Sequence, residues 1–177
     1  MRRAAILLVV VGLAAAAAGP SRAGVPELDW FEGELGQVLH VHGMTFVASE
    51  GSSNEIVLRS ERTLFYPERQ VADLERVDIE VAPGDGRTGF RMNCDEGRLN
   101  LATHAFVAEG NVVGTIEGGR DFEAAWVAYD ERAGVLYTND PVLITDEGGR
   151  YRGGGFRYFV EERRFRLEGG ATVVQEP

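Results

Sequence analysis

Apolar and polar side chains alternate in Phe156-Arg157-Tyr158-Phe159-Val160-Glu161, near the C-terminal end of the chain. A period of two sends successive side chains of a β-strand to opposite faces of its sheet. We therefore predict a strand over this stretch, with Phe156, Tyr158 and Val160 on the inner face. Phe165 and Leu167 alternate with charged residues in the same way, and we expect them to point inward as well.

The same pattern recurs earlier in the chain. The shift that places Trp126 on Phe156 also places Val135 on Phe165 and Tyr137 on Leu167. A repeat of about 30 residues indicates units that stack around one continuous core, although a meander of similar hairpins also produces chance matches. Carried through the copies, the pattern predicts these inner-face residues: Val112, Trp126, Val135, Tyr137, Val142, Ile144, Phe156, Tyr158, Val160, Phe165 and Leu167.

The chain after residue 23 is β-prone throughout. Runs such as residues 77–81 and 142–145 alternate with turn signals about every 10–15 residues, which is the spacing of antiparallel sheets. No window there holds a convincing apolar stripe at helical period. We predict one all-β domain over residues 24–177, elongated and built from repeats of about 30 residues, with an open edge strand at each end. Such edges must be protected or must pair with another sheet.

Residues 1–23 have the pattern of a targeting segment. The basic Met1-Arg2-Arg3 precedes an apolar run from Ala4 to Gly19, and Ser21 and Ala23 fit a cleavage site. We expect a signal peptide that is cleaved after Ala23. The alternative is a short membrane anchor over residues 4–19, although this run is shorter than the ~18–20 residues that span a bilayer. On either interpretation the domain is exported, because the two Arg residues hold the N-terminus on the cytoplasmic side.

The charge of the chain excludes some classes of function. Its 18 basic residues are all Arg and stand against 28 Asp and Glu, for a net charge of −10. A nucleic-acid binder needs a basic face that releases counterions, so we expect no nucleic-acid partner. The single cysteine, Cys94, excludes an internal disulfide. We expect a small buried hydrophobe there, with a reactive thiol as the alternative.

Signals for catalysis or metal binding are weak. His40 and His42 share one face of a strand, where two imidazoles could hold a metal, but a third ligand is not evident nearby. We therefore expect exposed or hydrogen-bonded histidines, no metal and no cofactor. No Ser lies in a G-x-S-x-G elbow, and nothing singles out a pair of carboxylates. We predict no catalytic residues and a protein that is not an enzyme.

The predicted interior is rich in aromatic side chains, which leaves two interpretations. One is the ordinary packed core of a β-sandwich. The other is an apolar groove for acyl chains, because a pair of sheets that does not close leaves its inner faces available to a lipid.

Four stretches resemble sequences of a known family. Leu58 to Tyr66 resembles the family's strand that ends in an aromatic before a turn, and Gly110-Asn111-Val112 resembles its recurring G-N-V. Tyr137 to Ile144 resembles its T-x-x-P-V-x-I stretch, and Gly153-Gly154-Gly155-Phe156 its G-x-G-hydrophobic stretch. From about Gln37 to Val174 the chain thus resembles the LptC-type periplasmic proteins of lipopolysaccharide export. The related LptA type, within the same LptA/OstA-like β-jellyroll superfamily, is the second choice.

The resemblance implies a twisted antiparallel β-jellyroll of about 15 strands, in the periplasm or anchored in the inner membrane by residues 4–19. It implies lipopolysaccharide transport for outer-membrane biogenesis, with lipid A acyl chains held at the predicted inner-face residues. The N-terminal edge would accept lipopolysaccharide from the inner-membrane ABC transporter, and the C-terminal edge strand would pair with an LptA-like jellyroll. Six Arg residues between Arg150 and Arg166 would lie near lipid phosphates, unless they form a solvated face. The alternative function is an exported structural or adhesive β-repeat protein with a dry core and no cargo.

Overall fold

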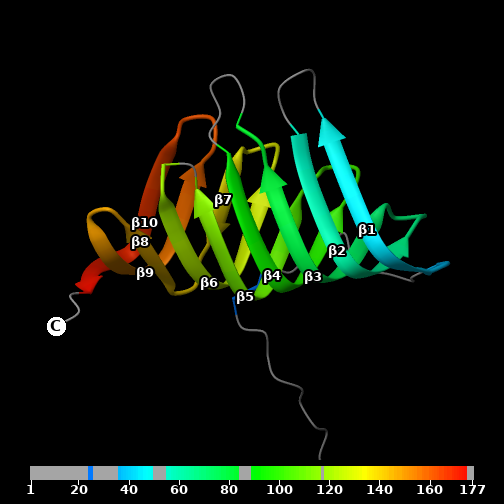
Figure 1. The fold of residues 1–177 in the computed structure, drawn as a ribbon, viewed down its shortest axis with the longest axis horizontal. Helices are drawn as coiled ribbons and strands as arrows, with labels where there is room; N and C mark the ends of the chain where they lie inside the picture. The colour runs from blue at the N-terminus through cyan, green and yellow to red at the C-terminus, as the bar shows by residue number, and fades with distance from the viewer. Residues whose placement is uncertain (1–23, 26–35, 50–54, 84–88, 117, 175–177) are drawn as a thin grey trace, which may run out of the picture.

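An all-β fold is confirmed by the computed structural model, which describes residues 24–25, 36–49, 55–83, 89–116 and 118–174. The described residues form ten strands in one antiparallel sheet and no helix (Figure 1). The strands are β1 (Leu39–Ser49), β2 (Glu55–Tyr66), β3 (Val71–Val81), β4 (Phe90–Asn100), β5 (Phe106–Ile116), β6 (Arg120–Asp130), β7 (Val135–Thr138), β8 (Val142–Asp146), β9 (Gly149–Phe159) and β10 (Arg164–Val174). The jellyroll architecture and the count of about 15 strands are not confirmed.

The strands follow one another through the sheet in chain order. The order is β1-β2-β3-β4-β5-β6-β7-β9-β10. The short strands β7 and β8 share one position, because each of them pairs with both β6 and β9. Strands β1 and β10 are the two edges of the sheet, and each pairs with one neighbour within the described part of the chain.

In the second half of the sheet, the step between the starts of corresponding strands is one residue shorter than the predicted repeat. Strands there start at positions 106, 135 and 164, and at positions 120 and 149. The step before these, from position 90 to position 120, has the predicted length. Because side chains alternate with a period of two, an error of one residue in the repeat exchanges the two faces of the sheet.

The strands bend near their middle, where inward-pointing positions are three residues apart instead of two. In β3, Leu74 and Val77 are buried, and the two residues between them, Glu75 and Arg76, are exposed. Strands β2 and β4 repeat this pattern at residues 60–63 and 94–97. Arg76 has a φ of 51°, and β5 and β10 have register shifts at residues 109–112 and 168–171. Left-handed residues and bulges interrupt the pleat and bend a strand.

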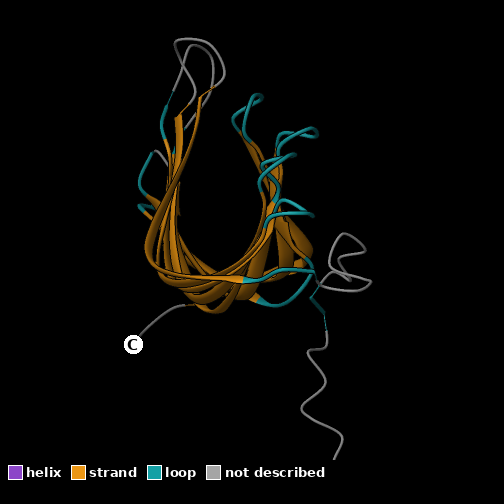
Figure 2. Ribbon diagram, turned by 90° about the vertical axis from the view of Figure 1, so that its right-hand side faces the viewer, coloured by secondary structure: helices purple, strands orange, loops and turns teal. Residues whose placement is uncertain are grey.

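Together the bends fold the sheet into a U, which Figure 2 shows end on. We call its two sides arm 1 and arm 2. Arm 1 holds the strand segments 44–49, 55–60, 77–81, 90–94, 112–116, 120–124, 142–146 (all of β8), 149–153 and 171–174. Arm 2 holds the other half of each long strand and all of β7. On the outer side of the bend, Arg76 pairs with Glu61 at 2.6 Å and Arg62 with Glu75 at 3.0 Å.

The two arms meet only through side chains in the described residues. Every backbone pairing between described strands runs along the sheet, and none joins arm 1 to arm 2. Side-chain packing, rather than backbone hydrogen bonds, therefore holds the two arms together across the interior of the U.

The N-terminal segment is described only at Gly24 and Val25 before the sheet region begins at Gly36. The predicted signal peptide or anchor, residues 1–23, lies outside the described residues. In the part of the chain that the structure covers, no helix has the length and hydrophobicity needed to cross a bilayer.

Candidate functional site

Two apolar rows cross the whole sheet on its inner face. In arm 2, successive cross-strand partners form the row Leu39, Phe65, Ala72, Leu99, Phe106, Tyr129, Leu136, Tyr158 and Phe165. In arm 1, they form the row Phe46, Leu58, Ile79, Met92, Gly114, Phe122, Ile144, Tyr151 and Val173. A β-carbon at Gly114 would overlap the Phe122 ring, so the glycine makes room for its neighbour. Both rows thus run from one edge strand to the other without a charged residue.

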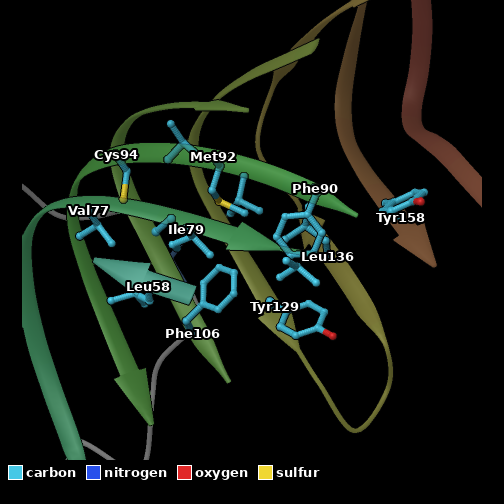
Figure 3. Close-up of a cluster of buried hydrophobic side chains, with 14 of the residues drawn as sticks. Leu58, Val77, Ile79, Phe90, Met92, Cys94, Phe106, Tyr129, Leu136 and Tyr158 are labelled. Atoms are coloured by element: carbon cyan, nitrogen blue, oxygen red, sulfur yellow. The ribbon is translucent and has the colours of Figure 1, made fainter. Parts of the chain in front are cut away.

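Aromatic rings of the two arms meet inside the U. The ring centroid of Phe90, in arm 1, lies 5.6 Å from that of Tyr129 and 6.5 Å from that of Phe106, both in arm 2. Figure 3 shows these three rings and Leu136 gathered in one part of the core. Centroid distances of about 4.5–7 Å are those of packed aromatic pairs. Side chains therefore fill this part of the interior in the structure.

The larger of the two clusters of buried apolar side chains lies inside the U, and we call it the main core. Eight predicted inner-face residues belong to it. Val112, Val142, Ile144, Phe156, Tyr158 and Val160 are buried in it, and Phe165 and Leu167 are partly buried against it. The Phe156 ring lies 5.3 Å from Phe122 and stacks on Phe165 at 5.4 Å. The structure thus places these eight residues inside the U, and their contact with lipid stays a prediction.

The prediction that Trp126 and Tyr137 share this interior is wrong. Trp126 is buried with Val107 and Ala128 in a separate cluster, and Tyr137 packs against it. The register places this cluster on the outer face, because Ala128 pairs with Tyr137 whereas the adjacent Tyr129 belongs to the inner row. We call Val107, Trp126, Ala128, Tyr137 and the adjoining Val25 the Trp126 cluster.

Val135 also lies on the outer face. It precedes Leu136, which is in the inner row of arm 2, and it pairs with Phe159 rather than with Tyr158. The reason for all three errors is the shorter hairpin. The shift that carries Trp126 onto Phe156 matched outer positions of one hairpin to inner positions of the next.

The Trp126 cluster is held by polar contacts at its rim. The indole Nε1 donates to Oδ2 of Asp140 at 2.8 Å, and the indole and Tyr137 rings meet nearly perpendicularly at 6.0 Å. The guanidinium of Arg157 lies 5.3 Å from the centroid of the Tyr137 ring, which is a cation–π contact. An indole that is 1% exposed thus has its single donor satisfied.

Several large inner residues were not among those that the sequence pattern predicted. Phe90, Phe106, Phe122, Tyr129 and Leu136 are all nearly fully buried in the main core. A usable signal for the bend is present in the sequence. Charged pairs interrupt the alternation at residues 61–62, 75–76 and 95–96, and each pair marks the outer side of the bend.

Cys94 lies in the main core of arm 1, as predicted for a small buried hydrophobe. Its Sγ donates to the carbonyl oxygen of Glu96 at 3.0 Å. Burial is the largest cause that raises the pKa of the Cys94 thiol to about 12. The thiolate is the reactive form of cysteine, so this environment disfavours the reactive-thiol alternative.

We expect Cys94 to react with a thiol reagent at pH 8 more than about 100-fold more slowly than an exposed cysteine. The matched control is Val113→Cys in a Cys94→Ala background, because Val113 is on the same arm and exposed. The folded-state pKa lies above the ordinary value of 9.0, so the thiol contributes stability below pH 9 that is lost as the pH rises toward 12. Cys94→Ala should flatten the fall of Tm in that window. Equal labelling rates would contradict the burial.

His40 and His42 lie exposed on the outer face of β1, beside a hollow of about 410 Å³. Two ion pairs, Arg62–Glu75 and Arg98–Glu109, also line this hollow. Among the residues with described positions, no three His, Cys, Asp or Glu side chains gather as a metal site. Four of the charged side chains that line the hollow thus already pair with one another.

The arginines between residues 150 and 166 lie on β9, on β10 and in the turn between them. Arg157 donates to Glu168 at 3.3 Å, and Arg164 pairs with Glu162 at 2.7 Å. These carboxylates offset the positive charge. A lipid phosphate at this end of the sheet would have to compete with them.

No protein-family model and no curated protein matches the sequence of this chain. We therefore infer the function of the inner face from its chemistry. The inner face offers apolar contact from one edge strand to the other, and the few polar side chains buried on it, Ser60, Thr63 and Thr138, are uncharged.

Proposed function

We propose that the protein carries lipopolysaccharide across the periplasm, with the acyl chains of lipid A against the inner face of the U. The observation that carries this proposal is the pair of apolar rows that run from β1 to β10. A lipid with several acyl chains cannot cross water alone, because each exposed CH₂ costs about 0.8 kcal/mol. A track of many similar apolar positions holds such chains weakly at each point and lets them slide.

Loading requires arm 1 and arm 2 to separate, because side chains occupy the interior. The contacts across the mouth are between side chains. The Phe46 and His104 rings are 5.7 Å apart, and the Arg120 guanidinium lies 4.9 Å from the Phe165 ring centroid. Entering acyl chains would replace apolar contacts between the arms with apolar contacts of their own. The net cost of opening is then small compared with breaking a hydrogen-bonded seam.

We further propose that the two edges supply the partners. The β1 edge would receive lipopolysaccharide from the inner-membrane ABC transporter, and β10 would pair with an LptA-like jellyroll. Unpaired N–H and C=O groups make an edge strand a template for another sheet. Added strands would extend both apolar rows in register. On this proposal the U is a β-jellyroll, in which each bent strand counts as two halves and the strand count rises accordingly.

The close packing of Phe90, Phe106 and Tyr129 favours a second candidate function. A structural or adhesive β-repeat protein needs a dry core and no cargo, and such a core consists of rings in mutual contact. The two candidates differ in whether lipid reaches the inner face in the cell.

We expect a photoreactive residue at position 158 to form an adduct with lipopolysaccharide in an exporting bacterium. Tyr158 is buried in the inner row of arm 2. The matched control is position 157, because Arg157 is adjacent and lies on the outer face with Tyr137. The adducts are detected by probing a blot for lipopolysaccharide.

An adduct at 158 and none at 157 supports the lipid carrier and the strand register together. Adducts at neither position, with a folded and exported protein, overturn the lipid proposal and leave the dry structural module. Adducts at both positions point to nonspecific membrane contact and also count against the proposal.

A further inference from the structure

Gly24 lies against the carboxylate of Asp140. A β-carbon at Gly24 would be 2.5 Å from Oδ2 of Asp140, and the φ of Gly24 is 100°, a conformation that L side chains rarely adopt. The Gly24 Cα is therefore within about 4 Å of the carboxylate, given a bond length of about 1.5 Å. Val25, the next residue, packs against the Trp126 cluster. Two consecutive residues thus dock the start of the domain on the outer face.

Asp140 is fixed in place by the residues around it. Its Oδ2 accepts the indole Nε1 hydrogen bond of Trp126 at 2.8 Å, and its backbone N–H donates to Oγ1 of the buried Thr138 at 3.2 Å. Arg157, on the neighbouring strand β9, donates instead to Asn139 and Glu168. The carboxylate is thus oriented toward Gly24 by groups that do not neutralise it.

Gly24 is also the first residue after the predicted cleavage point, the Ala23–Gly24 bond. In the uncleaved chain the Gly24 nitrogen is a neutral amide. Hydrolysis of that bond by a signal peptidase consumes one water, leaves a carboxylate on Ala23 and frees an α-amino group on Gly24. This amino group is protonated at neutral pH, one bond of about 1.46 Å from Cα.

We propose that Asp140 is a binding site for the α-ammonium group of the mature N-terminus, formed only after cleavage. The ion pair, with Val25 seated in the Trp126 cluster, then locks the mature end onto arm 2. Capture of a terminal amine is a known mode of recognition, and here a side-chain carboxylate would supply the acceptor. This inference is independent of lipid transport, since it concerns the outer face.

The α-amino group can be labelled selectively, because the chain has no Lys. In the chain from Gly24 to Pro177 the α-amine is then the one primary amine that an acylating reagent can label. We expect this amine to be labelled about threefold more slowly in the mature protein than in its Asp140→Asn variant. Asparagine keeps an acceptor for the Trp126 indole, so the fold is retained. The control is Asp121→Asn, which removes an exposed carboxylate on arm 1 and should leave the rate unchanged.

A second comparison does not depend on the variant. A chain that keeps Ala23 moves the amine by one residue, about 3.8 Å, and should be labelled faster than the mature chain, with no response to Asp140→Asn. Equal labelling of the mature and extended chains, or no effect of Asp140→Asn on the mature chain, would overturn the proposal. Intact-mass measurement of protein recovered from an exporting host gives the first residue. Any first residue other than Gly24 would also overturn it.

Discussion

We expect a Val112→Asp protein to be unfolded, whereas the protein with the neighbouring change, Val113→Asp, should stay folded. Val112 is 0% exposed in the main core, and Val113 is 46% exposed on the other side of the same strand. A carboxylate at Val112 must be buried without a partner or must force the core open, at a cost of several kcal/mol. That cost is comparable to the whole stability of a domain, about 5–15 kcal/mol. Urea denaturation followed by circular dichroism measures both variants.

Phe156→Asp extends the same expectation to the other arm. The Phe156 ring contacts Phe122 of arm 1 and Phe165 of β10, so a charge there disrupts packing between the arms as well as within one. We expect loss of cooperative unfolding, or loss of soluble protein. A Phe156→Asp protein that folds and exports lipopolysaccharide normally would remove the assignment of the inner face. A Val113→Asp protein as unstable as Val112→Asp would do the same.

The β character of this chain could be predicted because it is local. Alternation places Phe156 and Tyr158 on one face through the geometry of a single strand, and the structure agrees. The length of the repeat is different, because it depends on turns. One residue fewer in the hairpin carries Trp126 to the opposite face, and no property of the residue itself reveals this. A tryptophan side chain can be buried equally well in either apolar cluster.

The bend could be predicted only in part, for a related reason. It depends on residues such as Arg76, which adopts a left-handed conformation although it is not glycine. The exposed ion pairs Arg76–Glu61 and Arg62–Glu75 lie on the outer side of the bend at this point. In β2, β3 and β4 the bend leaves a trace as two consecutive charges. In β6 and β9 the corresponding positions hold Ala125-Trp126 and Gly154-Gly155, so the trace disappears.

We expect Trp126→Ala to lower the free energy of unfolding by about 3–5 kcal/mol, as for other large aromatic residues removed from a packed cluster. Trp126→Phe should cost less. It keeps most of the apolar contact with Val107 and Ala128 but removes the indole N–H that donates to Asp140, a loss of about 1–2 kcal/mol. Urea denaturation of the two variants separates the packing contribution from that of the hydrogen bond.

Trp126 also tests which face of the sheet binds lipid, because replacing it should leave the two inner rows unchanged. The Trp126 cluster is outside the two inner rows, so the folded Trp126→Phe protein should keep the lipopolysaccharide adduct at position 158 at its original yield. An inner aromatic changed as conservatively, Phe106→Leu, should reduce that yield, since Phe106 lies in the same row as Tyr158. If Trp126→Phe abolished the adduct while stability stayed high, the Trp126 cluster would contribute to lipid binding, and its separation from the inner rows would be wrong.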